Sequence, residues 1–211
     1  MSEKIHVFDL DLTFVNVNTF HCWMKFLVKT FWYNPKIIAA IIKITLKRYL
    51  RLCKHSEMKR EILRITNKYS RNINISGFVD FLEKKINKKV FEHYSSIRNE
   101  ITILATAAPD IYAIPFGKKL GFTFITATSS LISDDWVENI KEQKCISVQK
   151  IIHSNTACTG KNIEIITDHH DDLPLMKLAG DTILVNPGEK TVSIVKNNSI
   201  KYSVFQCESV V

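Results

Sequence analysis

The spacing of apolar residues divides this chain into a long helical block and a region in which short strands alternate with helices. Between residues 15 and 99, apolar side chains recur at the three- and four-residue spacing of helices, and glycines are few. Polar residues and a proline stand where helices are expected to begin. The predicted helices run from Asn18 or Thr19 to Phe31, from Pro35 to Arg51, from Ser56 onward, and, as one or two helices, from Ser76 to Tyr94.

The strand-like runs are short, rich in β-branched residues, and followed by small or polar residues. They cover residues 5–8, 101–105, 122–126, 163–167 and 182–185, and helical stretches at 113–120, 148–153 and 173–179 lie between the later ones. Residues 191–196 and 201–205 flank two asparagines, which predicts a terminal hairpin.

Alternation of strands and helices at this spacing predicts an α/β fold with a doubly wound parallel sheet. The first strand belongs with the later ones, so residues 1–14 and 100–211 are expected to form the core, with residues 15–99 as an inserted all-helical domain. In such a sheet the active groups lie beyond the C-terminal ends of the strands.

Composition narrows the class of partner but does not identify one. The 211 residues are 45% hydrophobic and 24% charged, as in ordinary globular proteins, and the net charge is +8. This charge favours phosphorylated ligands or an anionic membrane surface; we expect no nucleic acid partner. The five cysteines form no Cys-x-x-Cys pair, and the opening residues carry no secretory pattern, so we expect free thiols in a cytoplasmic protein.

Carboxylates and a hydroxyl follow three of the predicted strands. Asp9 and Asp11 come after the first strand, Thr106 after the second, and Asp168 and Asp172 after the fourth. Residues two apart in a strand point to the same side, so Asp9 and Asp11 are expected to face one spot. Their repulsion calls for a shared proton or for a hard cation such as Mg²⁺, although an Asp-x-Asp pair also arises by chance at a strand end.

These motifs together resemble those of the haloacid dehalogenase-like hydrolases, in the branch that is similar to phosphoserine phosphatases. The matching residues, in chain order, are Asp9-Leu10-Asp11-Leu12-Thr13, Thr106, Lys150, Asp168, Asp172 and Asn186-Pro187. The resemblance covers the whole predicted core, and the helical insertion stands where that branch carries a cap domain. It implies a Mg²⁺-dependent phosphatase with a cap over its active site.

The resemblance also implies a role for each matching residue. Asp9 would attack phosphorus to give an aspartyl-phosphate, and Asp11 would protonate the leaving oxygen and then activate water. The metal ligands would be Asp9, the backbone carbonyl of Asp11 and Asp168, with Asp172 in support. Thr106 and Lys150 would bind the phosphoryl oxygens. A non-catalytic or phospho-acceptor protein that keeps the pocket for binding is the alternative.

Several residues depart from the family pattern. Leu12 and Thr167 stand where glycine is common, and the segment before Lys150 lacks the usual glycines. Lys161 is the alternative lysine, but only six residues separate it from Asp168. The segment Thr106-Ala-Ala-Pro also differs from the Ser-Gly-Gly-Phe type of phosphoserine phosphatases, which argues against phosphoserine as the substrate. A phospholipid phosphate and a small anionic phosphomonoester are the leading candidates.

The helix between Lys36 and Lys54 has a basic stripe on an otherwise apolar surface. At about 100° per residue, Lys36, Lys43, Lys47 and Lys54 fall on one side. Such a helix is typical of segments that lie in an anionic membrane interface. The alternative is a helix buried among other cap helices with its lysines in water.

Overall fold

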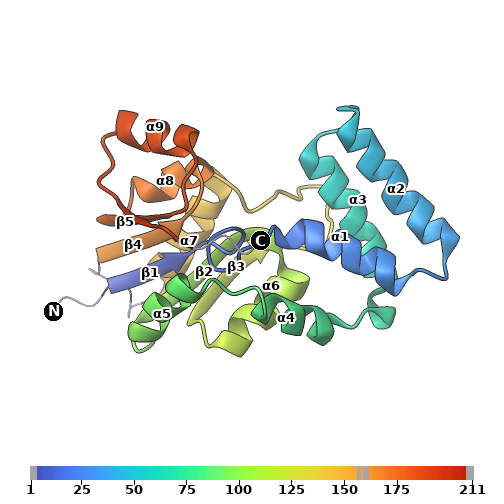
Figure 1. Ribbon diagram of the computed structural model, residues 1–211, viewed down its shortest axis with the longest axis horizontal. Helices are drawn as coiled ribbons and strands as arrows, with labels where there is room; N and C mark the ends of the chain where they lie inside the picture. Colours follow the sequence, from blue (N-terminus) through green and yellow to red (C-terminus); the bar gives the residue numbers. More distant parts are fainter. Residues whose placement is uncertain (1–3, 156–157, 159–161, 208–211) are drawn as a thin grey trace.

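The computed structural model describes residues 4–155, 158 and 162–207 and shows the predicted α/β architecture (Figure 1). Six parallel strands form one sheet in the order β3-β2-β1-β4-β5-β6. They are β1 (Lys4–Phe8), β2 (Ile101–Pro109), β3 (Phe124–Thr128), β4 (Asn162–Thr167), β5 (Asp181–Val185) and β6 (Ser203–Phe205). The central position of β1 confirms that the first strand belongs with the later ones.

Pairing of the strands sets the position of the groups that follow them. Phe8, the last residue of β1, pairs with Leu104 of β2 on one side and with Ile166 of β4 on the other. Because all three strands run in the same direction, the residues after Phe8, Leu104 and Ile166 gather at one edge of the sheet.

The helices of the α/β region agree with the prediction except at the C-terminal end. They are α6 (Asp110–Leu120), α7 (Glu142–Ser154), η3 (His170–Asp172), α8 (Leu173–Met176) and α9 (Glu189–Asn197). The predicted hairpin is wrong, because its first arm is α9 and its second arm contains β6, which pairs with β5 in parallel. Thr191 and Val195 are both buried and four residues apart, a helical spacing that the β-branched composition of the segment obscured.

The block between β1 and β2 is helical, as predicted. It comprises α1 (Thr19–Thr30), α2 (Pro35–Tyr49), α3 (His55–Lys68), η1 (Ser70–Asn72), α4 (Ile75–Glu83) and α5 (Lys88–Ser96). We call α1 to α3, residues 19–68, the helical lobe. In Figure 1 this lobe extends away from the sheet, whereas α4 lies beside α6 and α5 beside the strands.

Contacts of α5 show that the last part of this block is anchored in the core. The ring of Tyr94 packs against Phe8, Phe14 and Phe122, with centroids 4.7–5.7 Å apart. The Tyr94 hydroxyl donates a hydrogen bond to the Leu120 carbonyl at 2.9 Å. The division into a core of residues 1–14 and 100–211 and a cap of residues 15–99 stays a prediction.

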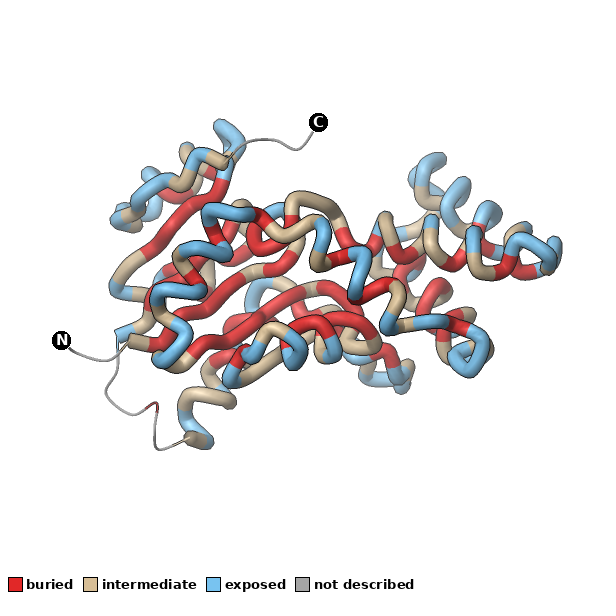
Figure 2. Tube along the Cα trace, turned by 60° about the horizontal axis from the view of Figure 1, so that its bottom comes forward, coloured by how far each residue is buried: buried red, intermediate tan, exposed pale blue. Residues whose placement is uncertain are grey.

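Apolar residues cover both faces of the sheet, and buried positions follow most of the strands in Figure 2. Successive residues of β1 serve opposite faces: Val7 packs among Ile103, Ile165 and Val148, and Phe8 among the aromatic rings on the side of α5. Within the described ranges, no helix is both long and apolar enough to cross a membrane.

Candidate active site

A tight turn after β1 places the first two carboxylates. The Asp9 N–H donates to the Ile166 carbonyl at 2.9 Å, which extends the pairing with β4 by one residue. The chain then reverses, and the Val15 N–H donates to the Leu10 carbonyl at 3.0 Å. Leu12 in this turn has a φ of 56°, the left-handed conformation that glycine adopts most easily. This explains why glycine is common here in the family that the sequence resembles.

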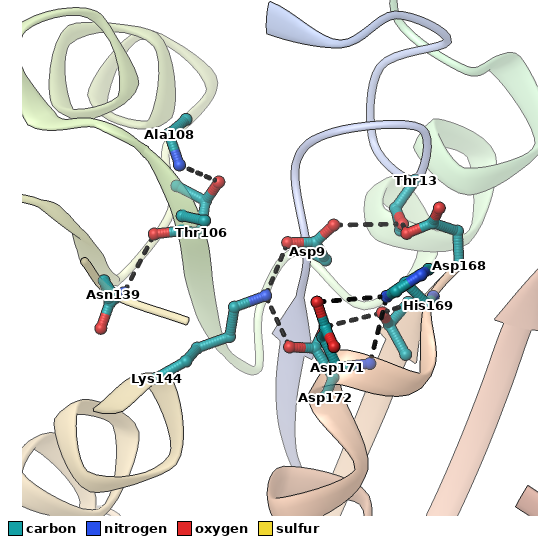
Figure 3. A network of polar contacts seen from close by, with 12 residues as sticks. Asp9, Thr13, Thr106, Ala108, Asn139, Lys144, Asp168, His169, Asp171 and Asp172 are labelled. Carbon is teal, nitrogen blue, oxygen red and sulfur yellow. Dashed lines mark hydrogen bonds and ion pairs between the residues drawn. The ribbon is translucent and has the colours of Figure 1, made fainter. Parts of the chain in front are cut away.

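Carboxylates from opposite ends of the chain meet around one lysine and one hydroxyl (Figure 3). The Nζ atom of Lys144 lies 2.8 Å from Asp9 Oδ1 and 2.7 Å from Asp172 Oδ1. The hydroxyl of Thr13 lies 3.5 Å from Asp9 Oδ2 and 3.3 Å from Asp168 Oδ1. The predicted convergence of Asp9, Asp168 and Asp172 is therefore observed.

Charge in this cluster is not balanced by the protein. Burial, together with Asp172 and Asp168, raises the pKa of Asp9 to about 8 despite the adjacent Lys144. Burial and Asp172 likewise raise the pKa of Asp168 to about 7. Three carboxylates share one ammonium group, so a further positive charge between Asp9 and Asp168 would relieve their repulsion. Carboxylate oxygens are the ligands that Mg²⁺ prefers, and the donor set therefore fits this ion.

Asp172 has contacts that differ from those of a metal ligand. Its Oδ1 atom pairs with Lys144, and its Oδ2 atom accepts a 2.7 Å hydrogen bond from the hydroxyl of Thr167. Both Asp172 oxygens have protein donors at 2.7 Å, whereas Asp9 Oδ2 has, among the described residues, only the Thr13 hydroxyl at 3.5 Å. We therefore assign Asp172 to the orientation of Lys144. Thr167, which stands where glycine is common, also accepts a 3.3 Å hydrogen bond from the His169 N–H. Its hydroxyl makes two contacts that glycine would lack.

Asp11 points toward the start of the helical lobe. Its Oδ1 atom accepts a 2.7 Å hydrogen bond from the N–H of Thr19, the first residue of α1. The Thr19 hydroxyl in turn lies 3.1 Å from the hydroxyl of Tyr112. Burial raises the pKa of Asp11, although the bond with Thr19 and the charge of Lys59 act in the opposite direction. Asp11 lines the same cavity as Asp9.

Thr106 lies in β2 beside the cavity. Its hydroxyl oxygen accepts a 3.0 Å hydrogen bond from the N–H of Ala108, and its carbonyl accepts one from the Asn139 amide at 3.0 Å. An accepting hydroxyl keeps its own proton, so Thr106 can still donate to an oxygen in the cavity. Its role in binding a phosphoryl oxygen stays a prediction.

The lysine of the site is Lys144, and the prediction of Lys150 is wrong. Lys150 is exposed on α7 and does not line the cavity. The two lysines are six residues apart, which separates them by about 240° around a helix. The error arose because α7 begins at Glu142, six residues before the predicted helical stretch at 148–153. Lys161, the alternative, lies outside the described residues.

The helical lobe supplies a second part of the site that the sequence analysis did not identify. Phe20 of α1 and His55 and Lys59 of α3 line a cavity of about 250 Å³ together with the carboxylates. Lys59 is buried, forms an ion pair with Glu138, and donates to the Ala107 carbonyl at 3.1 Å. The sequence did contain a signal that Lys59 is buried, because this lysine shares the buried face of its helix with Ile62, Leu63 and Thr66.

The chain is similar to a known protein family over most of its length. A family model described as haloacid dehalogenase-like hydrolase matches residues 6–177. No curated protein matches the sequence.

Solved structures with the same fold include proteins of both unknown and known activity. A protein of unknown function from Bordetella pertussis Tohama I has a TM-score of 0.78 at 15% identity, over 98% of this chain and 99% of that chain. A phosphoserine phosphohydrolase-like protein from Francisella tularensis has a TM-score of 0.60 at 15% identity, over 97% and 95%. A phosphoserine phosphatase, solved as a phospho-aspartyl intermediate analogue, has a TM-score of 0.58 at 15% identity, over 99% and 96%.

Proposed function

This chain belongs to the haloacid dehalogenase-like hydrolases, and on that premise we propose that it is a Mg²⁺-dependent phosphatase that hydrolyses a phosphate monoester. The observation that carries the proposal is the meeting of Asp9, Asp168, Lys144 and Asp11 at one cavity. Hydrolysis of a phosphate monoester needs a nucleophile, a proton donor and cancellation of charge on the phosphoryl oxygens. For each of these three requirements, the cavity contains a residue that can meet it.

Asp9 is the proposed nucleophile. Its carboxylate is fixed by Lys144 on one oxygen and lies beside Thr13 on the other, so its direction is set before substrate arrives. Attack on phosphorus gives an aspartyl-phosphate and releases the alcohol of the substrate. The analogue of a phospho-aspartyl intermediate in a structural neighbour supports this choice for the present chain.

Asp11 is the proposed acid and base. It donates a proton to the leaving oxygen in the first step and takes one from the attacking water in the second. Its bond with the N–H of Thr19 holds one oxygen in place at the start of α1. The presence of this residue favours catalysis over simple phosphate binding, because binding alone needs no proton donor.

Mg²⁺ would be held by Asp9, by Asp168 and by the backbone carbonyl of Asp11. When bound, the ion would offset the negative charge that the carboxylates and the phosphoryl group bring together. Lys144 and Thr106 would contact the phosphoryl oxygens, and Asp172 would keep Lys144 in position.

We infer that the substrate carries negative charge beyond the phosphoryl group itself. Lys59 reaches the cavity from α3 and is paired with Glu138 in this structure. An anionic part of the substrate would compete with Glu138 for this ammonium group. The helical lobe thus acts, in our proposal, as the cap that selects between a small anionic phosphomonoester and a lipid headgroup phosphate.

Phosphate release tests the proposal directly. The assay compares p-nitrophenyl phosphate and a panel of phosphomonoesters in Mg²⁺ and in EDTA. We expect metal-dependent turnover, a loss of about 100-fold or more in Asp9→Asn, and no change in Asp134→Asn, which alters an exposed carboxylate. Absence of metal-dependent turnover across the panel, with the protein folded, would leave a phosphate-binding or phospho-acceptor protein instead.

A further inference from the structure

The outer surface of α2 is unusually apolar for an exposed helix. Only Ile37 and Ile41 of this helix are buried, whereas Ile42 and Leu46 are 57% and 52% exposed and Tyr49 is 82% exposed. In Figure 1 this helix forms the outer side of the helical lobe, at the end of the molecule remote from α9. One face of the helix packs against α1 and α3, and the opposite face is exposed.

Exposed apolar side chains gather around this helix. Of the 15 large apolar side chains that are exposed in the described part of the chain, seven lie between residues 32 and 52. They are Trp32, Tyr33, Ile42, Leu46, Tyr49, Leu50 and Leu52, and we call them the α2 apolar surface. A groove of about 620 Å³ between α1 and α2 continues this surface, with Met24 and Val28 on its other wall. Apolar surface of this extent on a monomer marks an interaction site.

Charge in the same segment is of one sign. Eight of the 29 basic side chains lie between residues 12 and 56, where no acidic residue occurs, and the other 21 are matched by 21 acidic side chains. The whole net charge of +8 therefore resides in this segment. Lys36, Lys43 and Lys47, all exposed, follow one flank of the apolar stripe of α2. The prediction of one helix as far as Lys54 is wrong, because α2 ends at Tyr49 and Lys54 stands at the start of α3.

From these two observations we propose that the α2 apolar surface docks on an anionic membrane surface. Aliphatic and aromatic side chains would enter the region between headgroups and acyl chains, while the lysines beside them would meet anionic headgroups. Aromatic residues such as Trp32, Tyr33 and Tyr49 are favoured at this depth because their rings are apolar and their edges polar. Docking of this kind needs no transmembrane helix.

A second copy of the chain fits this surface less well. A symmetric interface brings the same patch together from both copies, so the two basic segments would face each other and repel. A nucleic acid would match the lysines but would leave Ile42, Leu46 and Leu52 without an apolar partner. The anionic bilayer satisfies both features at once.

A hollow beside the α2 apolar surface shares one lining residue with the cavity of the proposed active site. Arg48, Arg51 and Lys54 line this hollow, which also includes His55, and His55 lines the cavity of the carboxylates. Docking would therefore bring the His55 side of the cavity close to the headgroups. The docking inference itself does not depend on catalysis and is tested without it.

Co-sedimentation with vesicles tests the inference. The full chain is mixed with vesicles of phosphatidylcholine alone or with 40% phosphatidylglycerol, at low and at high salt. We expect binding to the anionic vesicles only, weakening with salt because the lysine contribution is screened. The emission of Trp32, which is 76% exposed, should shift to shorter wavelength on binding, and Trp32→Phe should remove most of the shift.

Two sets of variants separate the contributions. Each lysine near an anionic surface contributes about fivefold to the partition coefficient, so Lys36→Gln, Lys43→Gln and Lys47→Gln together should lower it about 100-fold. The matched control makes the same change at Lys190, Lys196 and Lys201, which are exposed at the other end of the molecule, and should bind several-fold more weakly at most. Ile42→Ser with Leu46→Ser should abolish the tryptophan shift and leave the fold unchanged.

Three results would overturn the inference. One is the absence of binding to anionic vesicles at low salt. Another is equal loss of binding in the two lysine sets, which would show attraction by net charge alone. The last is a concentration-dependent dimer that Ile42→Ser with Leu46→Ser dissociates, which would assign the surface to a second copy of the chain.

Discussion

Replacement of Lys144 by methionine tests the assignment of the site lysine most directly. Methionine keeps much of the length of lysine but removes its charge, and Lys144 has a side chain that is only 5% exposed. Its ammonium group lies 2.8 Å from Asp9 Oδ1 and 2.7 Å from Asp172 Oδ1. Removing it leaves two buried carboxylates without their counter-charge. The matched control is Lys150→Met, which makes the same change on the exposed side of the same helix.

The expected magnitudes of the two changes differ clearly. Breaking a buried ion pair by removing one partner costs about 3–5 kcal/mol of unfolding free energy, whereas an exposed substitution stays within about 0.5 kcal/mol. Loss of a preorganised donor to the phosphoryl oxygens should also lower kcat by about 100-fold or more. Lys150→Met should leave kcat unchanged.

Urea denaturation followed by circular dichroism measures the first effect, and phosphate release in Mg²⁺ measures the second. Each variant is compared with the parent protein in the same buffer. Equal stability of Lys144→Met and Lys150→Met would show that the ion pairs of Lys144 do not hold the site together. A loss of activity in Lys150→Met alone would show that Lys150, the residue predicted from the sequence, is the site lysine.

Further predictions concern the metal, a buried histidine and the lysine of the helical lobe. Mg²⁺ at 100 times its Kd should stabilise the protein by about 2.7 kcal/mol in thermal unfolding. Asp168→Asn should remove that gain. The same change should stabilise the metal-free protein, because it removes one of three crowded carboxylates. His6 lies between Glu164 at 2.7 Å and Glu100 at 3.1 Å. Although burial acts in the opposite direction, these bonds raise the pKa of His6 above 6.5. Burial also opposes the lowered pKa of Glu164, which His6 and His93 together hold below 4.5. The pair of His6 and Glu164 should thus stabilise the fold most between about pH 4.5 and 6.5 and lose about 1.5–3 kcal/mol as pH rises through the raised pKa of His6, and urea midpoints should show this loss in the parent and not in His6→Gln. Lys59→Met should raise KM for substrates with a second anionic group and leave KM for p-nitrophenyl phosphate nearly unchanged.

Each of these predictions has a result that contradicts it. A Mg²⁺-dependent gain that persists in Asp168→Asn would place the ion elsewhere. An unchanged pH dependence in His6→Gln would assign that dependence to other groups. Equal changes of KM for all substrates in Lys59→Met would show that this lysine shapes the cavity without recognising charge.

The fold was largely predictable because its signals are local and repeated. Alternating strands and helices gave the parallel sheet, and the position of Asp9 and Asp168 after strands predicted that they would meet. Lys144 was missed because its position depends on where α7 begins, and no glycine or capping residue marks that start. The hairpin was wrong because β-branched residues also occupy α9, where tertiary packing overrides their preference for strands.

Contacts made across the chain left weaker signals in the sequence. Lys59 contacts Ala107 and Glu138 only when α3 has packed against the core. The sequence does not show that these residues, far apart in the chain, lie close together. Leu12 adopts a left-handed conformation that its residue type disfavours, so only the resemblance to a family with glycine at this position indicated the turn.

The ring contacts of α1 determine whether the helical lobe of one protein can replace the lobe of a related protein. Trp23 lies against Phe78 of α4 and Tyr112 of α6, with centroids 4.9 and 5.2 Å apart, and its indole N–H donates to the Thr66 hydroxyl. In a chimera, the residue at position 23 would come from the donor protein, whereas the residues at positions 78 and 112 would come from the recipient. The three side chains would then not be matched to one another. Chimeras joined within residues 15–18 and 69–74 should therefore fold well only when those two recipient rings are changed together with the lobe.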